Sequence, residues 1–275
     1  MKAKGLGSIA LIGGGVMGEA FVRGLLRQAL CEAAQIVVSE PLAARRAELA
    51  AQLGMRAIAS NAEAARDAEI VILAVKPQVL DEALHDLAGQ LRPDALALSI
   101  VAGATIETLR RGLQLQAIVR VMPNTPGQVG QGISMWTATS EVTAAQRAQA
   151  QAIVGALGRE VYADKEDYLD MATALSGSGP AYVFLFIEAL TDAGVWMGLA
   201  RPVAEELALQ TVIGSGLYLR EVGAHPAVLR NRVTSPGGTT AEALQVLEEG
   251  AFRALVGRAV MAAYHRARTL GEAKS

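Results

Sequence analysis

The sequence predicts an α/β chain in which a doubly wound parallel sheet is followed by an all-helical region. Short and almost wholly apolar runs alternate with helical patterns in the first part of the chain, and no strand pattern appears after about Asp164. Apolar runs of this kind are typical of strands that helices cover on both faces. A length of 275 residues also suggests about two domains. We therefore predict a first domain over 1–164 and a helical second domain over 165–275.

The predicted strands of the first domain follow one another with helices between them. The clearest strands are 8–12, 36–39, 70–74, 95–100 and 117–121, and two later strands are 133–138 and 160–162. The helices are 18–29, 41–53, 79–90 and 144–157. Right-handed crossovers between parallel strands then place helices on both faces of one sheet.

The second domain opens with a helix that is apolar nearly all round. It begins at Pro180, and its only polar stripe is formed by Glu188, Thr191 and Asp192. Such a helix must be buried on several sides, and a region of about 110 residues forms few layers alone. We infer that the region packs against a second copy of itself. Membrane insertion is the alternative, and the two carboxylates within the span argue against it.

Composition and charge exclude several classes of function. The chain has 27 acidic and 25 basic residues, a net charge of -2, and so lacks the basic footprint of a nucleic-acid binder. Its single cysteine, Cys31, allows no internal disulfide and no cysteine-rich zinc site. The apolar start resembles a signal peptide, but successive glycines interrupt it. We expect a cytoplasmic protein with no metal and no membrane or nucleic-acid partner.

The strongest motif is G-x-G-x-x-G, directly after the first strand and before the first helix. Gly13 permits a tight turn, Gly15 lets the backbone approach a pyrophosphate, and Gly18 lets the helix pack closely on the strand. Free amides at the helix start then receive the negative charge. The alternative is a flexible turn. We predict a Rossmann-type dinucleotide site that includes Ile12, Gly13, Gly14, Gly15, Val16, Met17 and Gly18.

The residues after the second strand give conflicting indications of cofactor type. Glu40 lies 22 residues after Gly18, near the offset of an acid that holds the adenosine ribose, which favours NADH. Ser39 could instead donate a hydrogen bond to the 2′-phosphate of NADPH, with Arg45 and Arg46 within reach on the next helix. The alternative for both arginines is a solvated helix face, which we favour.

A run of four residues and one asparagine are further candidates for the cofactor site. The run Ala74, Val75, Lys76, Pro77 ends the strand 70–74, at the edge where doubly wound folds bind ligands. We include all four in the predicted cofactor site. Lys76 could contact the cofactor phosphates or ribose. An ordinary surface lysine at a strand end explains it equally well. Asn61 directly precedes a helix, which by itself favours an N-cap over a cofactor contact.

Two glycine-rich loops stand out in the helical half, at 176–180 and 235–240, and both precede helices. The second fits a capping box with Thr239 as N-cap and Glu242 three residues on, which leaves the Thr240 hydroxyl free. Backbone amides at such a helix start form a ready carboxylate site. Ordinary helix capping is the alternative. Two such loops in one domain favour a site for a small anion.

Five motifs together resemble the pyrroline-5-carboxylate reductase family across nearly the whole chain. They are Gly13 to Gly18, Ala74 to Pro77, Met122-Pro123-Asn124-Thr125-Pro126, Leu175 to Tyr182 and Ser235 to Thr240. The last two are distinctive of that family. The resemblance implies reduction of 1-pyrroline-5-carboxylate to L-proline with NADPH or NADH, the last step of proline biosynthesis. It also implies a nucleotide-binding domain followed by a helical dimerisation domain, assembled as homodimers or rings of dimers.

The resemblance also implies further cofactor contacts, at Ser39, Asn61, Ala102 and Glu166. Two positions depart from the family pattern. Glu40 stands where uncharged residues are common, and Arg232 stands just before the second loop, where an uncharged polar residue can contact the cofactor. We count both as cofactor-binding candidates, and both weigh against the family's leaning toward NADPH.

We expect the second loop to bind the substrate. Its carboxylate would sit on the amides around Ser235, Gly237, Gly238 and Thr239, while the Thr240 hydroxyl, our catalytic candidate, hydrogen-bonds the ring nitrogen. A threonine is a weak acid, so it orients an already protonated iminium or relays a solvent proton. Small residues around Ser178 would let the nicotinamide and the substrate ring approach closely.

The sequence leaves competing functions open. Hydroxyacid dehydrogenases of similar layout use a helix lysine, but Lys165 and Lys274, the only lysines after Lys76, do not lie on the long helix. His85, His225 and His265 fit structural or solvated positions. A dinucleotide-dependent regulatory protein without turnover and a reductase for a larger cyclic imine are the alternatives.

Overall fold

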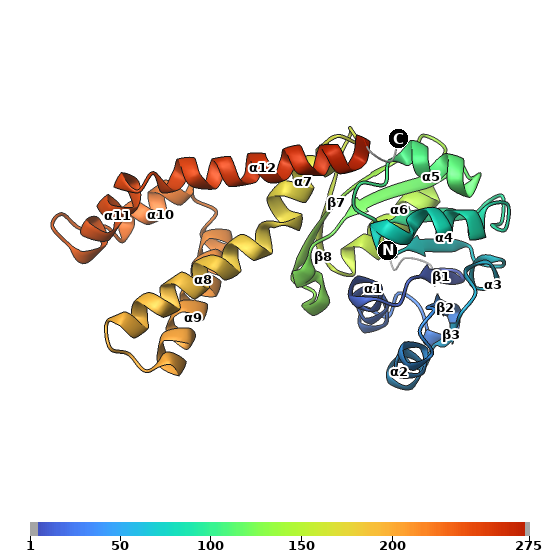
Figure 1. The fold of residues 1–275 in the computed structure, drawn as a ribbon, viewed down its shortest axis with the longest axis horizontal. Helices are drawn as coiled ribbons and strands as arrows, with labels where there is room; N and C mark the ends of the chain where they lie inside the picture. Colours follow the sequence, from blue (N-terminus) through green and yellow to red (C-terminus); the bar gives the residue numbers. More distant parts are fainter. Residues whose placement is uncertain (1–4, 273–275) are drawn as a thin grey trace. The chain divides into compact units, whose positions relative to one another are not determined.

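The computed structural model describes residues 5–272 (Figure 1). The chain divides into two compact units. The first runs to Ser178 and also contains the chain from Ala263 onward, and the second is Gly179–Ala262. The first unit thus ends later in the chain than the domain boundary that we predicted after residue 164. The predicted division into a nucleotide-binding and a substrate-binding domain stays a prediction.

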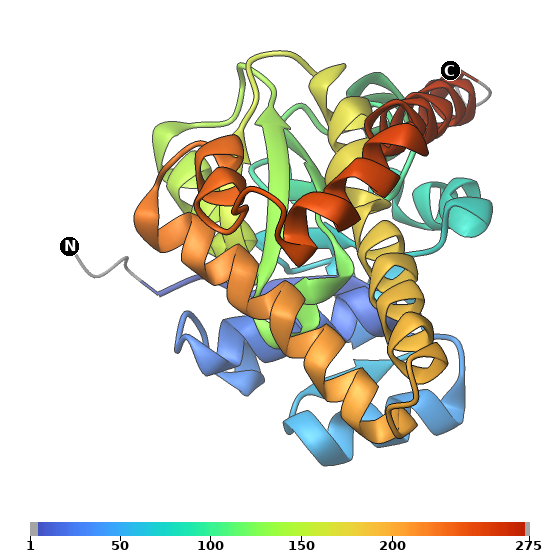
Figure 2. The same cartoon turned by 90° about the vertical axis from the view of Figure 1, so that its left-hand side faces the viewer.

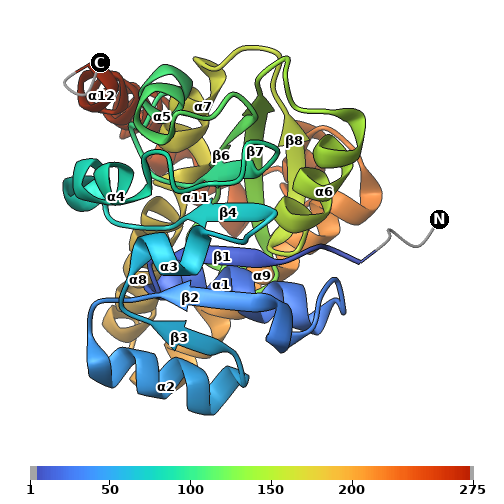
Figure 3. The same cartoon turned by 90° about the vertical axis from the view of Figure 1, so that its right-hand side faces the viewer.

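Eight described strands form one sheet in the first unit, in the order β3-β2-β1-β4-β5-β6-β7-β8 (Figure 3). Neighbours from β3 through β6 are parallel, β7 is antiparallel to β6, and β8 is parallel to β7. The predicted doubly wound fold is confirmed, with a mixed extension at one edge. The strands are β1 Ile9–Ile12, β2 Ile36–Ser39, β3 Arg56–Ile58, β4 Ile70–Leu73, β5 Leu96–Ser99, β6 Ile118–Met122, β7 Gly132–Ala138 and β8 Gly158–Tyr162.

Helices cover both faces of this sheet because its strands alternate between two apolar layers. Ile9 and Leu11 of β1 lie in one core with side chains of α1, α2 and α6, while Ala10 and Ile12 lie in the other with side chains of α3, α4 and α5. These helices are α1 Val16–Arg27, α2 Ala43–Leu53, α3 Asn61–Ala65, α4 Leu80–Leu87, α5 Ile106–Leu113 and α6 Ala144–Gly155.

The chain order changes direction at β1, whose neighbours are β2 on one side and β4 on the other (Figure 3). The crevice at the carboxyl ends of strands beside such a switch point is where open α/β sheets bind ligands. The glycine turn follows β1 directly, so the fold places it at this crevice.

The second unit is helical and exposes much apolar surface. Its helices are α8 Gly179–Trp196, α9 Arg201–Val222, α10 Pro226–Arg232, α11 Thr239–Glu249 and the first part of α12 Phe252–Glu272. Helices α8 and α9 form a hairpin in which a Cβ added at Gly194 would lie only 2.9 Å from Cβ of Ala204 (Figures 1 and 2). In contrast, α10 and α11 contain no buried residue among those described.

The helical stretch Tyr168–Trp196 is, within the described chain, the one long and apolar enough to cross a membrane by length and composition alone. Only 6% of its most apolar window is buried inside the chain. Exposed side chains such as Phe184, Leu185 and Trp196 also line the outside of α8. An apolar surface of this extent on a helical unit indicates a further covering layer.

Candidate functional site

The glycine turn is held between the ends of three strands. The amide of Gly13 donates to the carbonyl of Ser39 at the end of β2, at 2.9 Å. Its φ is +104°, and an added Cβ would lie 2.8 Å from the carbonyl oxygen of Ala74, just after β4. Only glycine fits both the positive φ and this close backbone approach. The role predicted for Gly13 in the tight turn therefore agrees with the geometry.

The other two motif glycines differ in what surrounds them. A Cβ added at Gly18 would lie 2.2 Å from the carbonyl oxygen of Gly13, whereas nothing lies within 4 Å of one added at Gly15. Gly15 is the N-cap of α1 and makes no side-chain cap. Val16, the first helical residue, is 61% exposed. The helix start thus presents free amides to an open space, which fits a pyrophosphate.

Glu40 is folded against the glycine turn. Its side chain is buried, with the residue only 8% exposed, and Oε2 accepts the Gly14 amide at 3.2 Å. Oε1 accepts the amide of Leu42 at 3.0 Å. The carboxylate at the ribose-holding offset is therefore fixed by two backbone donors. It lies beside the same turn that is predicted to hold the pyrophosphate.

Arg45 and Arg46 do not form a solvated helix face, so that interpretation is wrong. Both are half-buried, and Nε of Arg45 donates to the Gly14 carbonyl at 2.9 Å. Arg46 donates to the carbonyl of Glu40 at 2.8 Å. Partners far away in sequence, Gly14 and Glu19, hold the Arg45 guanidinium on the turn. The partners of Arg46 are instead local, since the carbonyls of Glu40 and Pro41 lie six and five positions away.

Glu19 completes this polar cluster from α1. It forms ion pairs with Arg23 and Arg45, and Arg45 also pairs with Glu48 at 2.8 Å. Burial raises the pKa of the Glu19 carboxyl, but the hydrogen bonds and charges of the two arginines outweigh it and hold the pKa below its ordinary range. The charged cluster therefore stiffens the frame around Gly14.

Asn61 is not the N-cap of α3, as the sequence alone favoured. Ser60 takes that place, and its side chain accepts the amide of Glu63. Asn61 is instead the first helical residue, and its Oδ1 accepts the buried hydroxyl of Ser39 at 2.7 Å, while Nδ2 donates to Asp86 at 3.0 Å. Two of the four residues that the family resemblance implied as cofactor contacts thus touch each other, at the end of β2 and the start of α3.

The Ala74–Pro77 run leaves the sheet beside the glycine turn. The Ala74 amide donates to the carbonyl of Ile12 at 2.8 Å. Lys76 is exposed and precedes a short 3₁₀ turn that starts at Pro77, and α4 follows from Leu80. The strand β4 ends directly before this run, one residue earlier than predicted, and Pro77 starts the 3₁₀ turn that leads into α4. Whether Lys76 contacts a ligand stays a prediction.

Glu166 is anchored by a buried arginine that sequence reasoning missed. Oε1 of Glu166 accepts the Ile106 amide at 2.7 Å and Nη1 of Arg120 at 2.9 Å, and Nη2 of Arg120 pairs with Asp170 at 2.8 Å. Ala102 lies in the loop between β5 and Ile106. The end of α12 packs there too, since a Cβ at Gly103 would lie 3.2 Å from the carbonyl oxygen of Leu270 (Figures 1 and 3).

The stretch around Ser176 is helical, so the prediction of a loop there is wrong. After α7 Tyr168–Ala172, residues Thr173–Gly177 form one turn of π-helix, and the Ser178 amide donates to the Thr173 carbonyl at 2.8 Å. Single π turns occur often at functional sites. The glycines and serines of this motif therefore lie where α7 continues through the π turn into α8.

The second loop is a tight turn, and the predicted capping box is absent. The Gly238 amide donates to the Ser235 carbonyl at 3.0 Å, and Gly237 has a φ of +69°. This Pro-Gly pair fits a type II turn. Gly238 is the N-cap of α11 without a side-chain cap, so Thr239, predicted as N-cap, is the first helical residue.

Thr240 is therefore the second helical residue rather than the first, and it is half-buried. The amides at this helix start have no intrahelical partner, as expected of a helix N-terminus. Arg232 is exposed at the end of α10, just before the turn. The predicted substrate residues other than Ser178 thus lie together in the second unit, and the predicted cofactor residues other than Arg232 lie in the first.

Comparison with known proteins decides the family. Residues 166–270 match a model described as pyrroline-5-carboxylate reductase dimerisation, and residues 8–103 match one described as NADP oxidoreductase, coenzyme F420-dependent. A pyrroline-5-carboxylate reductase of Synechocystis is 45% identical over 265 residues, covering 96% of this chain and 98% of that protein. The chain belongs to the pyrroline-5-carboxylate reductase family.

Solved structures agree with this assignment. The pyrroline-5-carboxylate reductase of Coxiella burnetii has a TM-score of 0.89 at 36% identity, covering 96% of this chain and 98% of that one. A pyrroline carboxylate reductase of Plasmodium falciparum with NADP bound has a TM-score of 0.87 at 33% identity, with the same coverage. The resemblance, the Rossmann-type fold followed by a dimerisation region, and the oxidoreductase class are thereby confirmed.

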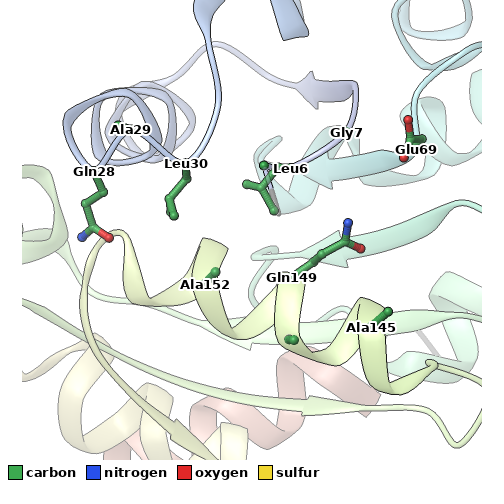
Figure 4. Close-up of a pocket in the computed structure, with 11 residues that line it drawn as sticks. Leu6, Gly7, Gln28, Ala29, Leu30, Glu69, Ala145, Gln149 and Ala152 are labelled. Carbon is green, nitrogen blue, oxygen red and sulfur yellow. The ribbon is translucent and has the colours of Figure 1, made fainter. Parts of the chain in front are cut away.

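A separate groove of this reductase lies at the other ends of the strands, opposite to the glycine turn. It has a volume of about 670 Å³ and runs between Leu6, Leu30 and helix α6, where Gln149 and Ala152 face it (Figure 4). It lies at the amino ends of β1 and β4, away from the glycine turn. Among the described residues that line it, none belongs to the predicted site.

Proposed function

We infer that the chain reduces 1-pyrroline-5-carboxylate to L-proline with NAD(P)H, the last step of proline biosynthesis. The observation that carries this inference is the identity of 45% to a pyrroline-5-carboxylate reductase over 96% of the chain. The glycine turn supports it independently, because its geometry fits a dinucleotide. The reaction forms one C–H bond at the imine carbon and leaves the ring nitrogen protonated.

The residues of the first unit fit a dinucleotide cofactor. Gly13 and Gly18 allow the tight turn, and the space at Gly15 with the free amides of α1 would hold the pyrophosphate. Glu40, Ser39 and the Ser39-bonded Asn61 would border the adenosine ribose. When bound, the reduced nicotinamide supplies the hydride. Lys76 after β4, Ala102 after β5 and Glu166, which is bonded to the Ile106 amide, are further proposed contacts.

The turn before α11 would bind the substrate carboxylate. Uncapped amides at a helix start and the positive end of its dipole favour an anion, and the Ser235–Gly238 turn exposes further backbone beside them. The hydroxyl of Thr240 would then hydrogen-bond the ring nitrogen. Because this hydroxyl is a weak acid, it orients the iminium or relays a solvent proton. Ser178 would line the space for the ring.

Residues 166–270 match a dimerisation model, which supports self-association of the chain. We propose a homodimer or a ring of dimers in which a second copy covers the apolar side chains of α8. The apolar hollow of about 450 Å³ beside Phe186 and Phe252 would be filled in the same way. A cytoplasmic location is the accompanying proposal.

The experiment that tests this function is an assay of cofactor oxidation with two substrates and two cofactors. Five-membered and six-membered cyclic imino acids are each supplied with NADPH and with NADH. We expect turnover with the five-membered substrate and a kcat/KM at least roughly tenfold above that of the six-membered one, as for pockets that differ by one methylene. Cofactor binding without oxidation of any pair would contradict the proposal.

A further inference from the structure

One face of β6 and its extension contacts the segment that carries Glu166 and Ser178. Arg120, Met122 and Asn124 occupy every second position, so they lie on the same side of the extended chain. Arg120 pairs with Glu166, and Cε of Met122 lies 2.5 Å from the place of a Cβ added at Gly177. The Met-Pro-Asn motif thus has a specific partner, the π turn.

Asn124 reaches the π turn through both ends of its carboxamide. Nδ2 donates to the carbonyl of Ser176 at 3.2 Å, while Oδ1 accepts the amide of Ile133 at 2.9 Å. The orientation of the amide follows from its neighbours, because the Ile133 amide can only donate and the Ser176 carbonyl can only accept. One side chain therefore joins β7 to the π turn.

The Ser176 carbonyl needs a donor of this kind because of the sequence that follows. In a regular helix it would accept from the amide four residues on, which is Pro180 and has no N–H. The π geometry shifts the pattern instead, so that the Ser178 amide bonds to Thr173, five residues back. Asn124 therefore donates to the Ser176 carbonyl, to which Pro180 cannot donate.

We propose that Asn124 is a positioning residue of the reductase. By holding the π turn, it sets the backbone of Ser178, the residue that we propose to line the substrate ring. The inference rests on the proposed function and adds a residue that acts on the substrate side of the reaction. Asn124 bonds to Ser176 and Ile133 and to no residue of the glycine turn, so we expect its substitution to change cofactor affinity little.

The test replaces Asn124 with aspartate, which keeps an acceptor for the Ile133 amide and removes the donor to Ser176. We expect the Kd for NADPH, from nicotinamide fluorescence, to stay within about twofold and kcat/KM for the imino acid to fall by roughly ten- to a hundredfold. Hydrogen exchange of the peptide 173–178, which contains the Ser178 amide, is expected to accelerate. Gln149→Glu is the matched control, since it makes the same amide-to-carboxylate change on α6.

The possible outcomes separate the two proposals. Wild-type protein without turnover contradicts the proposed function itself. Active wild type together with an Asn124→Asp variant of unchanged kcat/KM and unchanged exchange overturns the positioning role alone. Asn124→Ala is the second variant, with rates normalised to the fraction that binds NADPH. If neither variant yields folded protein, or if both lose activity only in proportion to that fraction, Asn124 serves folding and the proposal is wrong.

Discussion

The backbone amide of Gly14 donates a hydrogen bond to Oε2 of Glu40 at 3.2 Å, across 26 positions of sequence. The residue that is predicted to meet the adenosine ribose is therefore bonded to the turn that is predicted to meet the pyrophosphate. We therefore expect cofactor preference and turn geometry to depend on one carboxylate.

Removing the charge of Glu40 is expected to shift the enzyme toward NADPH, because the 2′-phosphate would no longer face a carboxylate. Glu40→Ser should raise the ratio of kcat/KM for NADPH over NADH by roughly tenfold, equivalent to about 1.4 kcal/mol. Glu40→Gln removes the charge but keeps one acceptor for the Gly14 amide. This variant therefore distinguishes the effect of the charge from an effect of altered turn geometry. A ratio that neither substitution changes would show that Glu40 does not read the ribose.

Alanine at two glycines of the motif should have opposite effects. Gly18→Ala places a Cβ 2.2 Å from the Gly13 carbonyl and is expected to destabilise the protein by roughly 1–3 kcal/mol. Gly15→Ala meets open space, and its φ of -70° suits alanine, so stability should change little. Its Kd for NADPH should nevertheless rise by roughly tenfold or more, because the Cβ would occupy the proposed phosphate position. Thermal melts and fluorescence titration check both, and the reverse pattern would contradict the assigned roles.

Loss of the Thr240 hydroxyl should impair turnover without abolishing it. We expect kcat of Thr240→Ala to fall by roughly ten- to a hundredfold, with the Kd for NADPH unchanged, because we propose that the hydroxyl orients the iminium and is not the ultimate proton source. Thr240→Ser, which keeps the hydroxyl, should retain most of the activity. Unchanged kcat and KM in the alanine variant would eliminate this role.

The Glu19 cluster predicts a pH dependence of stability. Since the pKa of Glu19 is lowered from its ordinary value of 4.5, its contribution is fully present above that value and is lost as pH falls through the lowered pKa. Glu19→Gln should therefore be less stable than wild type at pH 7, by about 1 kcal/mol, and the difference should shrink below pH 4. Urea denaturation across this range measures it, and a difference that grows on acidification would refute the sign.

Local sequence rules were sufficient where backbone geometry alone decides the structure. The roles predicted for Gly13 and Gly18 agree with the close contacts at the turn, and the apolar strands predicted the layers of the sheet. Capping was less predictable, because neighbouring residues compete for it. Ser60 caps α3 in place of Asn61, and the Pro-Gly turn makes Gly238 the cap of α11.

Features set by distant partners could not be predicted from local patterns. β3 has only three residues and begins with exposed Arg56, so no strand was predicted there, although it pairs with β2. Arg120 is buried, but its two carboxylate partners are 46 and 50 positions away. The π turn depends on Pro180 together with the Asn124 side chain, which donates to Ser176. These residues lie far apart in the sequence, so neither segment alone predicts the turn.

The most direct test of the proposed reduction follows the hydride itself. NADPH carrying deuterium at the transferred position is supplied with 1-pyrroline-5-carboxylate, and the product is analysed by mass spectrometry and NMR. We predict L-proline with one deuterium at C5, the former imine carbon, formed in equal amount to the cofactor oxidised. Cofactor oxidation without labelled proline, or bound NADPH with no oxidation at all, would contradict the account.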